Sequence, residues 1–135
     1  MKYVTFYLDN KNFGIPIKNV ISIERMTNLS SLPDQKSSQE LIGITNYRGQ
    51  VISIINTRSI LGLQRNGDQL NEEIIIIHSD GLTIGLAVDK TNNIINCTDE
   101  EIHKVVIGCK ETKVIQKYED LIIIIDILSV LSKYN

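Results

Sequence analysis

The chain has 135 residues, of which 42% are hydrophobic, so it is long enough for one domain with a sizeable core. Its formal net charge of −2 is close to balance and argues against a nucleic-acid partner, which usually requires a basic patch or stripe. The two cysteines, Cys97 and Cys109, form no C-x-x-C pair and have no histidine at ligand spacing, so neither a zinc site nor a disulfide framework is predicted.

The chain enters a strand at once, without the basic region and apolar core of a signal peptide. Residues 3–8 alternate apolar and more polar side chains, the polar residues 9–12 form a turn, and residues 13–17 continue as a second strand. Residues 27–39 are polar, include Pro33, and are expected to form a surface loop. No apolar run approaches the roughly 18 to 20 residues that span a bilayer, so we expect a cytoplasmic protein.

The next feature is a hairpin that displays one arginine. Apolar residues lead to Arg48 and follow it from Val51 to Ile55, while Gly49 supplies the positive φ that a tight turn needs. A planar guanidinium held on two strands is suited to binding a carboxylate or a backbone carbonyl of a partner. On propensity alone, a solvated turn residue is the competing interpretation of Arg48.

The remaining elements follow in order. Asn56 or Thr57 could cap a helical turn that Gly62 ends, and residues 64–71 are the best candidate for a connection between two halves. Asp80-Gly81 predicts a hairpin between residues 72–79 and 82–88, and residues 98–101 have the spacing of a capping box. Strands are predicted at 105–107, 113–118 and 121–125, followed by a helix over 127–133 that Asp126 caps, with an apolar stripe of Ile127, Leu128, Val130 and Leu131.

The isoleucine content favours strands, because β-branched side chains fit a pleated surface. Many short strands with one convincing helix predict a mainly β protein, either small barrels or a sandwich. The runs Ile74–Ile77 and Ile122–Ile125 lack polar alternation, so both should be buried on two sides. Two barrels packed together, or one barrel covered by the last helix, would achieve this.

The sequence contains no recognisable catalytic arrangement. His78 and His103 have no nucleophile or carboxylate at a catalytic spacing, and capping explains Asp89 and Asp126 more simply than acid–base chemistry. The glycines form no phosphate-binding loop. We therefore expect that the protein is not an enzyme and that it has no catalytic residue, no cofactor and no bound metal.

Residues 43–58 resemble the G-x-x-N-x-R-G-x-x-x-P-x-x-D-L-R signature of CheW-type chemotaxis coupling proteins, through Gly43, Asn46, Arg48, Gly49 and Arg58. Ser53 stands at the proline of the signature, and Asn56-Thr57 at its Asp-Leu. Other segments are similar to the family in order and spacing: Phe6–Asp9, Phe13–Ile17, Val20–Ile23, Leu32-Pro33, Gly85–Asp89 and Leu121–Asp126. The resemblance covers nearly the whole chain.

This resemblance implies two packed five-stranded SH3-like β-barrels with a short C-terminal helix. Residues 1–135 would then form a single CheW-like domain of two intertwined barrel subdomains, connected near 64–71. The implied function is a non-catalytic adaptor that joins the cytoplasmic tip of methyl-accepting chemoreceptors to the regulatory domain of the histidine kinase CheA.

By the same resemblance, the expected receptor-binding residues are Val20, Ile23, Arg48, Gly85 and Ile94, and the expected kinase-binding residues are Gly43 and Leu32. Plain core is the competing interpretation for Val20 and Ile23, and a bulge or barrel bend for Gly43.

Two alternatives stay open at this stage. One is a CheW-like adaptor of a phosphorelay other than chemotaxis. The other is a small ligand-binding β-barrel, in which Asp89, His78 and Arg48 would converge on a pocket.

Overall fold

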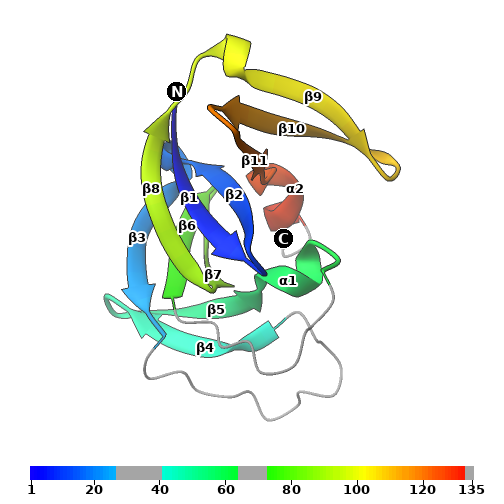
Figure 1. Cartoon of the computed structure of the whole chain (residues 1–135). Coiled ribbons are helices and arrows are strands. Elements are labelled where there is room, and N and C mark those ends of the chain that lie inside the picture. The colour runs from blue at the N-terminus through cyan, green and yellow to red at the C-terminus, as the bar shows by residue number, and fades with distance from the viewer. Residues whose placement is uncertain (27–40, 64–72, 133–135) are drawn as a thin grey trace.

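The computed structural model describes residues 1–26, 41–63 and 73–132. The predicted loop at 27–39, the predicted connection at 64–71 and Leu32 lie outside the described residues. The described chain forms two antiparallel-rich sheets with short helices at their ends (Figure 1). The prediction of a mainly β protein is confirmed.

The larger sheet has six strands in the order β8 (Lys90–Asn96), β1 (Lys2–Leu8), β2 (Lys11–Pro16), β11 (Asp120–Ile124), β10 (Lys110–Lys117) and β9 (Ile102–Ile107). The smaller sheet has five strands in the order β3 (Val20–Arg25), β6 (Glu73–Ser79), β7 (Leu82–Val88), β5 (Gln50–Asn56) and β4 (Leu41–Tyr47). The helical elements are η1 (Ile17–Asn19), α1 (Thr57–Ile60), η2 (Asp99–Glu101) and α2 (Ile127–Ser132). Among the described residues, no helix has the length and apolar character needed to cross a membrane.

The sixth strand of the larger sheet is β8, which the sequence did not predict. Its residues Lys90–Asn96 are mostly polar and exposed, yet they pair with β1, with Ile94 opposite Val4. Long-range pairing rather than local pattern therefore defines this strand, as is common for edge strands.

The tight turns follow the sequence predictions. Positive φ angles occur at both central residues of three two-residue turns: Asp9-Asn10 (53° and 66°), Arg48-Gly49 (51° and 82°) and Asp80-Gly81 (52° and 79°). This is the backbone pattern of type I′ turns, whose twist matches that of the flanking strands. The three predicted hairpins are confirmed.

The isoleucine run in β6 is buried on both sides, as expected. Ile75 and Ile77 contribute to a cluster between the two sheets, here called the central core, while Ile74 and Ile76 face the opposite way. The opposite cluster, here called the five-strand core, also contains Ile52, Ile54 and Ala87. One strand thus serves two cores, because successive side chains point to opposite faces.

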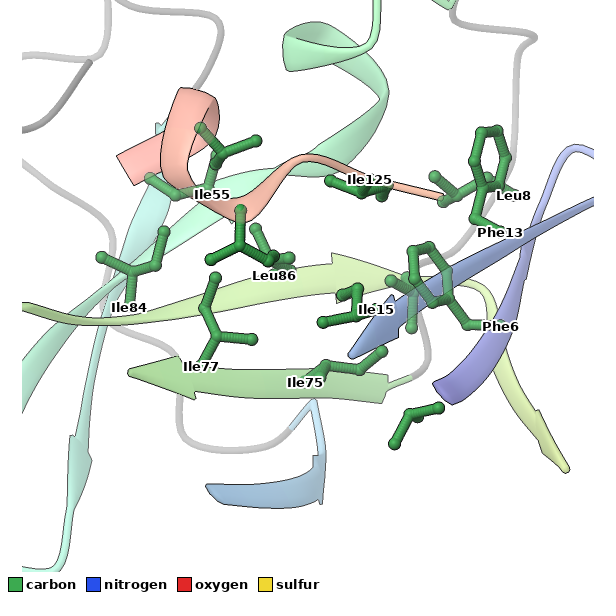
Figure 2. Close-up of a cluster of buried hydrophobic side chains, with 14 of the residues drawn as sticks. Phe6, Leu8, Phe13, Ile15, Ile55, Ile75, Ile77, Ile84, Leu86 and Ile125 are labelled. Carbon is green, nitrogen blue, oxygen red and sulfur yellow. The ribbon is translucent and has the colours of Figure 1, made fainter. Parts of the chain in front are cut away.

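The central core joins the two sheets (Figure 2). Phe6, Phe13 and Ile15 from the six-stranded sheet meet Ile75, Ile77 and Leu86 from the five-stranded sheet, all at most 3% exposed. A third cluster, here called the six-strand core, contains Tyr3, Cys97, Ile115 and Ile122 on the other face of the larger sheet. Each sheet therefore has a core of its own, and the two sheets share the central core between them.

The second isoleucine run is less buried than predicted. Ile122 and Ile125 are buried, but Ile123 and Ile124 are only half-buried. Both lie on β11, between β2 and β10, and Ile123 lines an open hollow that Val105 and Ile107 of β9 also border, so this side of the run is less covered than β6.

The C-terminal helix closes one end of the central core. Asp126 Oδ1 accepts a hydrogen bond from the Ser129 amide at 3.3 Å, which confirms the predicted cap. Ile127, Val130 and Leu131 are buried, but Leu128 is 63% exposed, so its place in the apolar stripe was wrong. Six helical residues present too narrow a face to bury four apolar side chains at once.

The other predicted helical turns are also observed. α1 begins after Asn56 and ends before Gly62, which has a φ of 71°, but Asn56 makes no side-chain capping bond. At η2 the Glu101 carboxylate accepts a hydrogen bond from the Thr98 amide at 2.9 Å. This bond lowers the pKa of Glu101, because it favours the charged carboxylate.

Candidate binding surface

The Arg48 hairpin is rigidly built. Asn46 Oδ1 accepts a hydrogen bond from the Gly49 amide at 3.0 Å and braces the turn. The guanidinium carbon of Arg48 lies 5.3 Å from the centre of the Tyr47 ring. Tyr47 in turn packs against the five-strand core, so the hairpin tip is tied to the interior.

Arg48 is exposed, and within the described residues it has no ion-pair partner. An exposed guanidinium that rests on an aromatic ring keeps its hydrogen-bond donors available. The local geometry therefore provides an oriented cation at the end of a two-stranded arm.

Val20 and Ile23 lie on β3, an edge strand of the five-stranded sheet. They pair with Ile77 and Ile75, whose side chains face the central core, and residues directly opposite in an antiparallel ladder point to the same face. Val20 packs against the central core, and Ile23 is 40% exposed at its border. These two residues extend the central core to the surface.

Ile94 occupies the corresponding position on β8, an edge strand of the six-stranded sheet. It pairs with Val4, a member of the central core, and is itself 58% exposed. Edge strands of both sheets thus carry an exposed isoleucine on the face that looks toward the shared core. We call Val20, Ile23 and Ile94 the apolar rim.

Gly85 does not lie on this surface. It is buried in the middle of β7, where a Cβ atom would be 2.6 Å from Ile54 Cδ1 and 2.7 Å from Ile74 Cγ2. Both isoleucines belong to the five-strand core, so glycine is needed there for close packing of the interior. Gly85 therefore shapes the interior of the five-stranded sheet, and its expected part in receptor binding stays a prediction.

Gly43 is buried in β4, an edge strand, next to a register shift between Leu41 and Gly43. A β-bulge accounts for a glycine at this position. Since Leu32 lies outside the described residues, the second predicted surface is represented here by Gly43 alone.

Arg58, which the sequence indicated only as the last residue of the signature, forms a buried ion network. Its Nε lies 3.0 Å from Asp9 Oδ1, its Nη2 donates to Asp89 Oδ1, and Asp89 Oδ2 accepts the Asp9 amide at 3.0 Å. The side chain is 4% exposed. Burial alone would lower the pKa of Arg58, but the two carboxylates outweigh it and raise that pKa.

This network joins the β1–β2 turn, α1 and the end of β7, and so fastens the two sheets to each other. Asp89 was expected to be a simple cap, and the structure corrects this: its carboxylate is the partner of Arg58. The sequence signal was present, because Asp9 and Asp89 each follow a buried strand and Arg58 ends the signature segment.

The predicted alternative pocket of Asp89, His78 and Arg48 does not form. His78 is exposed and its Nδ1 lies 2.6 Å from Thr83 Oγ1, near the start of β7, whereas Asp89 follows the end of that strand. Six residues of extended chain place them roughly 20 Å apart. The part of the chain that the structure describes also has no group of three or more histidine, cysteine or acidic side chains placed to hold a metal ion.

Both cysteines have free thiols. Cys97 is buried in the six-strand core, and burial is the main cause that raises its pKa, while Cys109 is exposed in the β9–β10 turn. Such a buried thiol behaves as a small apolar side chain.

Two packed β-subdomains, an exposed apolar rim and a braced arginine define a protein-binding module. The class agrees with a family model: the CheW-like domain matches residues 2–135, so the chain belongs to the CheW-like family of chemotaxis coupling proteins.

Curated relatives agree with this assignment. The chemotaxis protein CheW of Bacillus subtilis (strain 168) is 28% identical over 138 residues, which cover 98% of this chain and 87% of the relative. CheW of Klebsiella aerogenes is 27% identical over 75% of this chain, and CheW of Thermotoga maritima is 22% identical over 73%. The matched regions span 60% and 64% of those two relatives, less than two thirds of their length.

A solved structure establishes the same fold. The scaffolding protein TtCheW of Thermoanaerobacter tengcongensis superimposes with a TM-score of 0.78 at 24% identity, over 93% of this chain and 88% of that one. The prediction of two packed SH3-like barrels is confirmed, with one strand more than expected in the larger sheet.

Proposed function

We propose that the chain is a non-catalytic, cytoplasmic adaptor that couples chemoreceptors to the histidine kinase CheA. The family assignment over residues 2–135 supports the class of function. The observation that carries the proposal to a particular surface is the apolar rim, where edge strands of both sheets expose isoleucines that pair with members of the central core.

The rim suits the helical cytoplasmic tip of a receptor. An amphipathic helix docks by placing apolar side chains at intervals of three or four residues into an apolar groove. Ile23 and Ile94 would receive these anchors, and Arg48 would bind a carboxylate or carbonyl group beside them. Gly85 would act indirectly, by allowing the packing of the five-strand core.

A second surface would bind the regulatory domain of the kinase. Gly43 supports a place near the start of β4, at the opposite end of that strand from the Arg48 turn. Two partners could then be bound together. Signal transfer requires that the receptor's signalling states bind with different free energies, since equal affinity would shift no equilibrium.

The test measures both affinities on the same variants by calorimetry. Replacing Ile94 by Asp should weaken binding of a receptor-tip fragment by about tenfold or more, because a charge then faces the apolar anchors. Leu128→Asp is the matched control, since Leu128 is 63% exposed and lies on α2, away from the rim. It should leave receptor binding unchanged.

If the Ile94→Asp variant and the unmodified protein bind the receptor-tip fragment with equal affinity, the rim is not the receptor-binding surface. Pull-down from the native cell extract would separate chemotaxis from another phosphorelay, because it identifies the kinase and receptor retained.

A further inference from the structure

The β9–β10 hairpin is an exposed arm of the six-stranded sheet. β9 is the edge strand opposite to β8, and Figure 1 shows the hairpin extending away from the rest of the molecule. Three consecutive apolar residues on β9 are exposed: Val105 by 40%, Val106 by 74% and Ile107 by 50%. A long apolar edge strand is a template for pairing with another chain.

The backbone of β9 has groups available for such pairing. Ile107 pairs with Lys110 across the two-residue turn Gly108-Cys109, and this pair exchanges both of its hydrogen bonds. By the alternation of an antiparallel ladder, the N–H and C=O groups of Val106 and Lys104 point away from β10. They can pair with an added strand.

A hollow of about 840 Å³ lies beside this edge. Its floor is the face formed by Val105, Ile107, Val114, Leu121 and Ile123, and its far wall includes Tyr7 and Asn12 of the first hairpin. Ile123 also packs against the central core, so the floor is an uncovered continuation of the interior. Among the described residues, Asn12 Oδ1 in the wall is buried without a hydrogen-bond partner, which is unfavourable for a polar atom.

The charges around the hollow favour an acidic occupant. Lys11 and Lys104 line it against one acid, Asp120. Lys110 and Lys113 add positive charge along the hairpin, and the Lys104–Glu111 contact of 3.9 Å is weak because both side chains are mostly exposed. A second copy of this chain offers no matching charge, because β9 itself carries His103 and Lys104 and no acidic side chain.

We propose that this edge binds an extended peptide segment in which acidic and apolar residues alternate, by strand addition to β9. The apolar side chains would cover Val105 and Ile107 at the border of the hollow, and the acidic ones, on the other face of the added strand, would lie beside Lys104. The site is independent of the adaptor function proposed above, because the apolar rim lies on β3 and β8 rather than on β9.

The experiment uses two fluorescent hexapeptides, acetyl-Val-Glu-Val-Asp-Val-Glu-amide and its counterpart with lysine at every acidic position. The acidic peptide should bind the full chain and shift the amide resonances of β9, and the basic one should bind at least about tenfold more weakly. Equal binding of both, or binding of neither, would overturn the proposal. A dimer that forms through β9 would overturn it as well.

Two variants locate the binding. Val106→Pro removes an outward N–H without breaking a bond to β10, and Ile107→Glu places a negative charge on the apolar face of β9. Each should weaken the acidic peptide by about tenfold or more. Leu128→Glu is the control for the second variant, because Ile107 and Leu128 are both at least half exposed, by 50% and 63%. Affinity that survives Ile107→Glu in a folded protein would refute the site.

Discussion

At the scale of single residues, Arg48 and Arg58 have opposite surroundings although they are only ten positions apart. Arg48 is exposed at a hairpin tip, whereas Arg58 is held between two carboxylates in the interior. Burial and partners therefore decide whether each arginine affects binding or folding.

Arg48→Ala should leave the melting temperature unchanged within the equivalent of about 0.5 kcal/mol, because the side chain is exposed. Receptor-tip binding should weaken by roughly 2 kcal/mol, about thirty-fold, if this arginine is an anchor of the interface. Arg48→Lys should restore only part of the affinity, since an ammonium lacks the planar fork. Calorimetry and thermal melts on the same samples check both effects; a large loss of stability would make Arg48 a structural residue.

Arg58→Ala should lower the free energy of unfolding by roughly 3–5 kcal/mol, because Asp9 and Asp89 would remain as uncompensated charges. Urea denaturation measures this. Lys104→Ala is the control, since its contact with Glu111 is exposed and should contribute no more than about 1 kcal/mol. Similar losses for the two variants would show that the buried network does not fasten the sheets.

At the scale of elements, the two isoleucine runs differ in how deeply they are buried. Ile76→Asp should abolish folding, because Ile76 is 1% exposed in the five-strand core and an unpaired carboxylate there has no compensation. Ile124→Asp should destabilise less, since Ile124 is half-buried against the six-strand core. Circular dichroism and denaturant titrations rank the two, and wild-type-like melting of the Ile76 variant would contradict the double burial of β6.

The sequence predicted the hairpins because their turn residues act locally. The glycines of Asp80-Gly81 and Arg48-Gly49 permit the positive φ angles that two-residue hairpin turns need, and this is visible in the sequence without knowledge of long-range contacts. β8 was missed because its polar residues acquire strand structure only by pairing with β1. The Arg58 network was missed for the same reason, since its three members come together only after both sheets form.

The site residues expected from the sequence differ in burial, and their roles in partner binding stay predictions. Ile23, Arg48 and Ile94 are exposed, whereas Gly85 matched the family pattern but lies in the interior. A motif match identifies a position that matters, and only packing distinguishes a contact residue from one that shapes the core.

At the scale of the whole molecule, two groups in the six-strand core should make the free energy of unfolding decrease at alkaline pH. Burial is the main cause that raises the pKa of both Tyr3 and Cys97, from reference values of 10.0 and 9.0. Both groups hold their protons more tightly in the folded state, so their contribution is intact below about pH 9 and decreases as pH rises above it. Carboxylate effects such as that of Glu101 belong to the acid side instead.

Guanidinium titrations from pH 7 to 11 under reducing conditions should therefore show a falling free energy of unfolding above pH 9. Cys97→Ala should reduce the part of the slope that begins near pH 9, while the part due to Tyr3 remains. Cys109→Ala is the control, because that thiol is exposed. A pH profile unaffected by Cys97→Ala would show that the buried thiol does not titrate with unfolding.

The strand order of the two sheets has a consequence for how the protein is made. All five strands of the smaller sheet come from residues 20–88, whereas β2 in the larger sheet pairs in parallel with β11, through Phe13 and Ile123 from near opposite ends of the chain. During synthesis the smaller sheet can form before β11, the strand that pairs with β2 of the first hairpin, has been made. Phe6 and Phe13 then depend on the completed smaller sheet, or on a chaperone, to stay shielded from other chains on the ribosome.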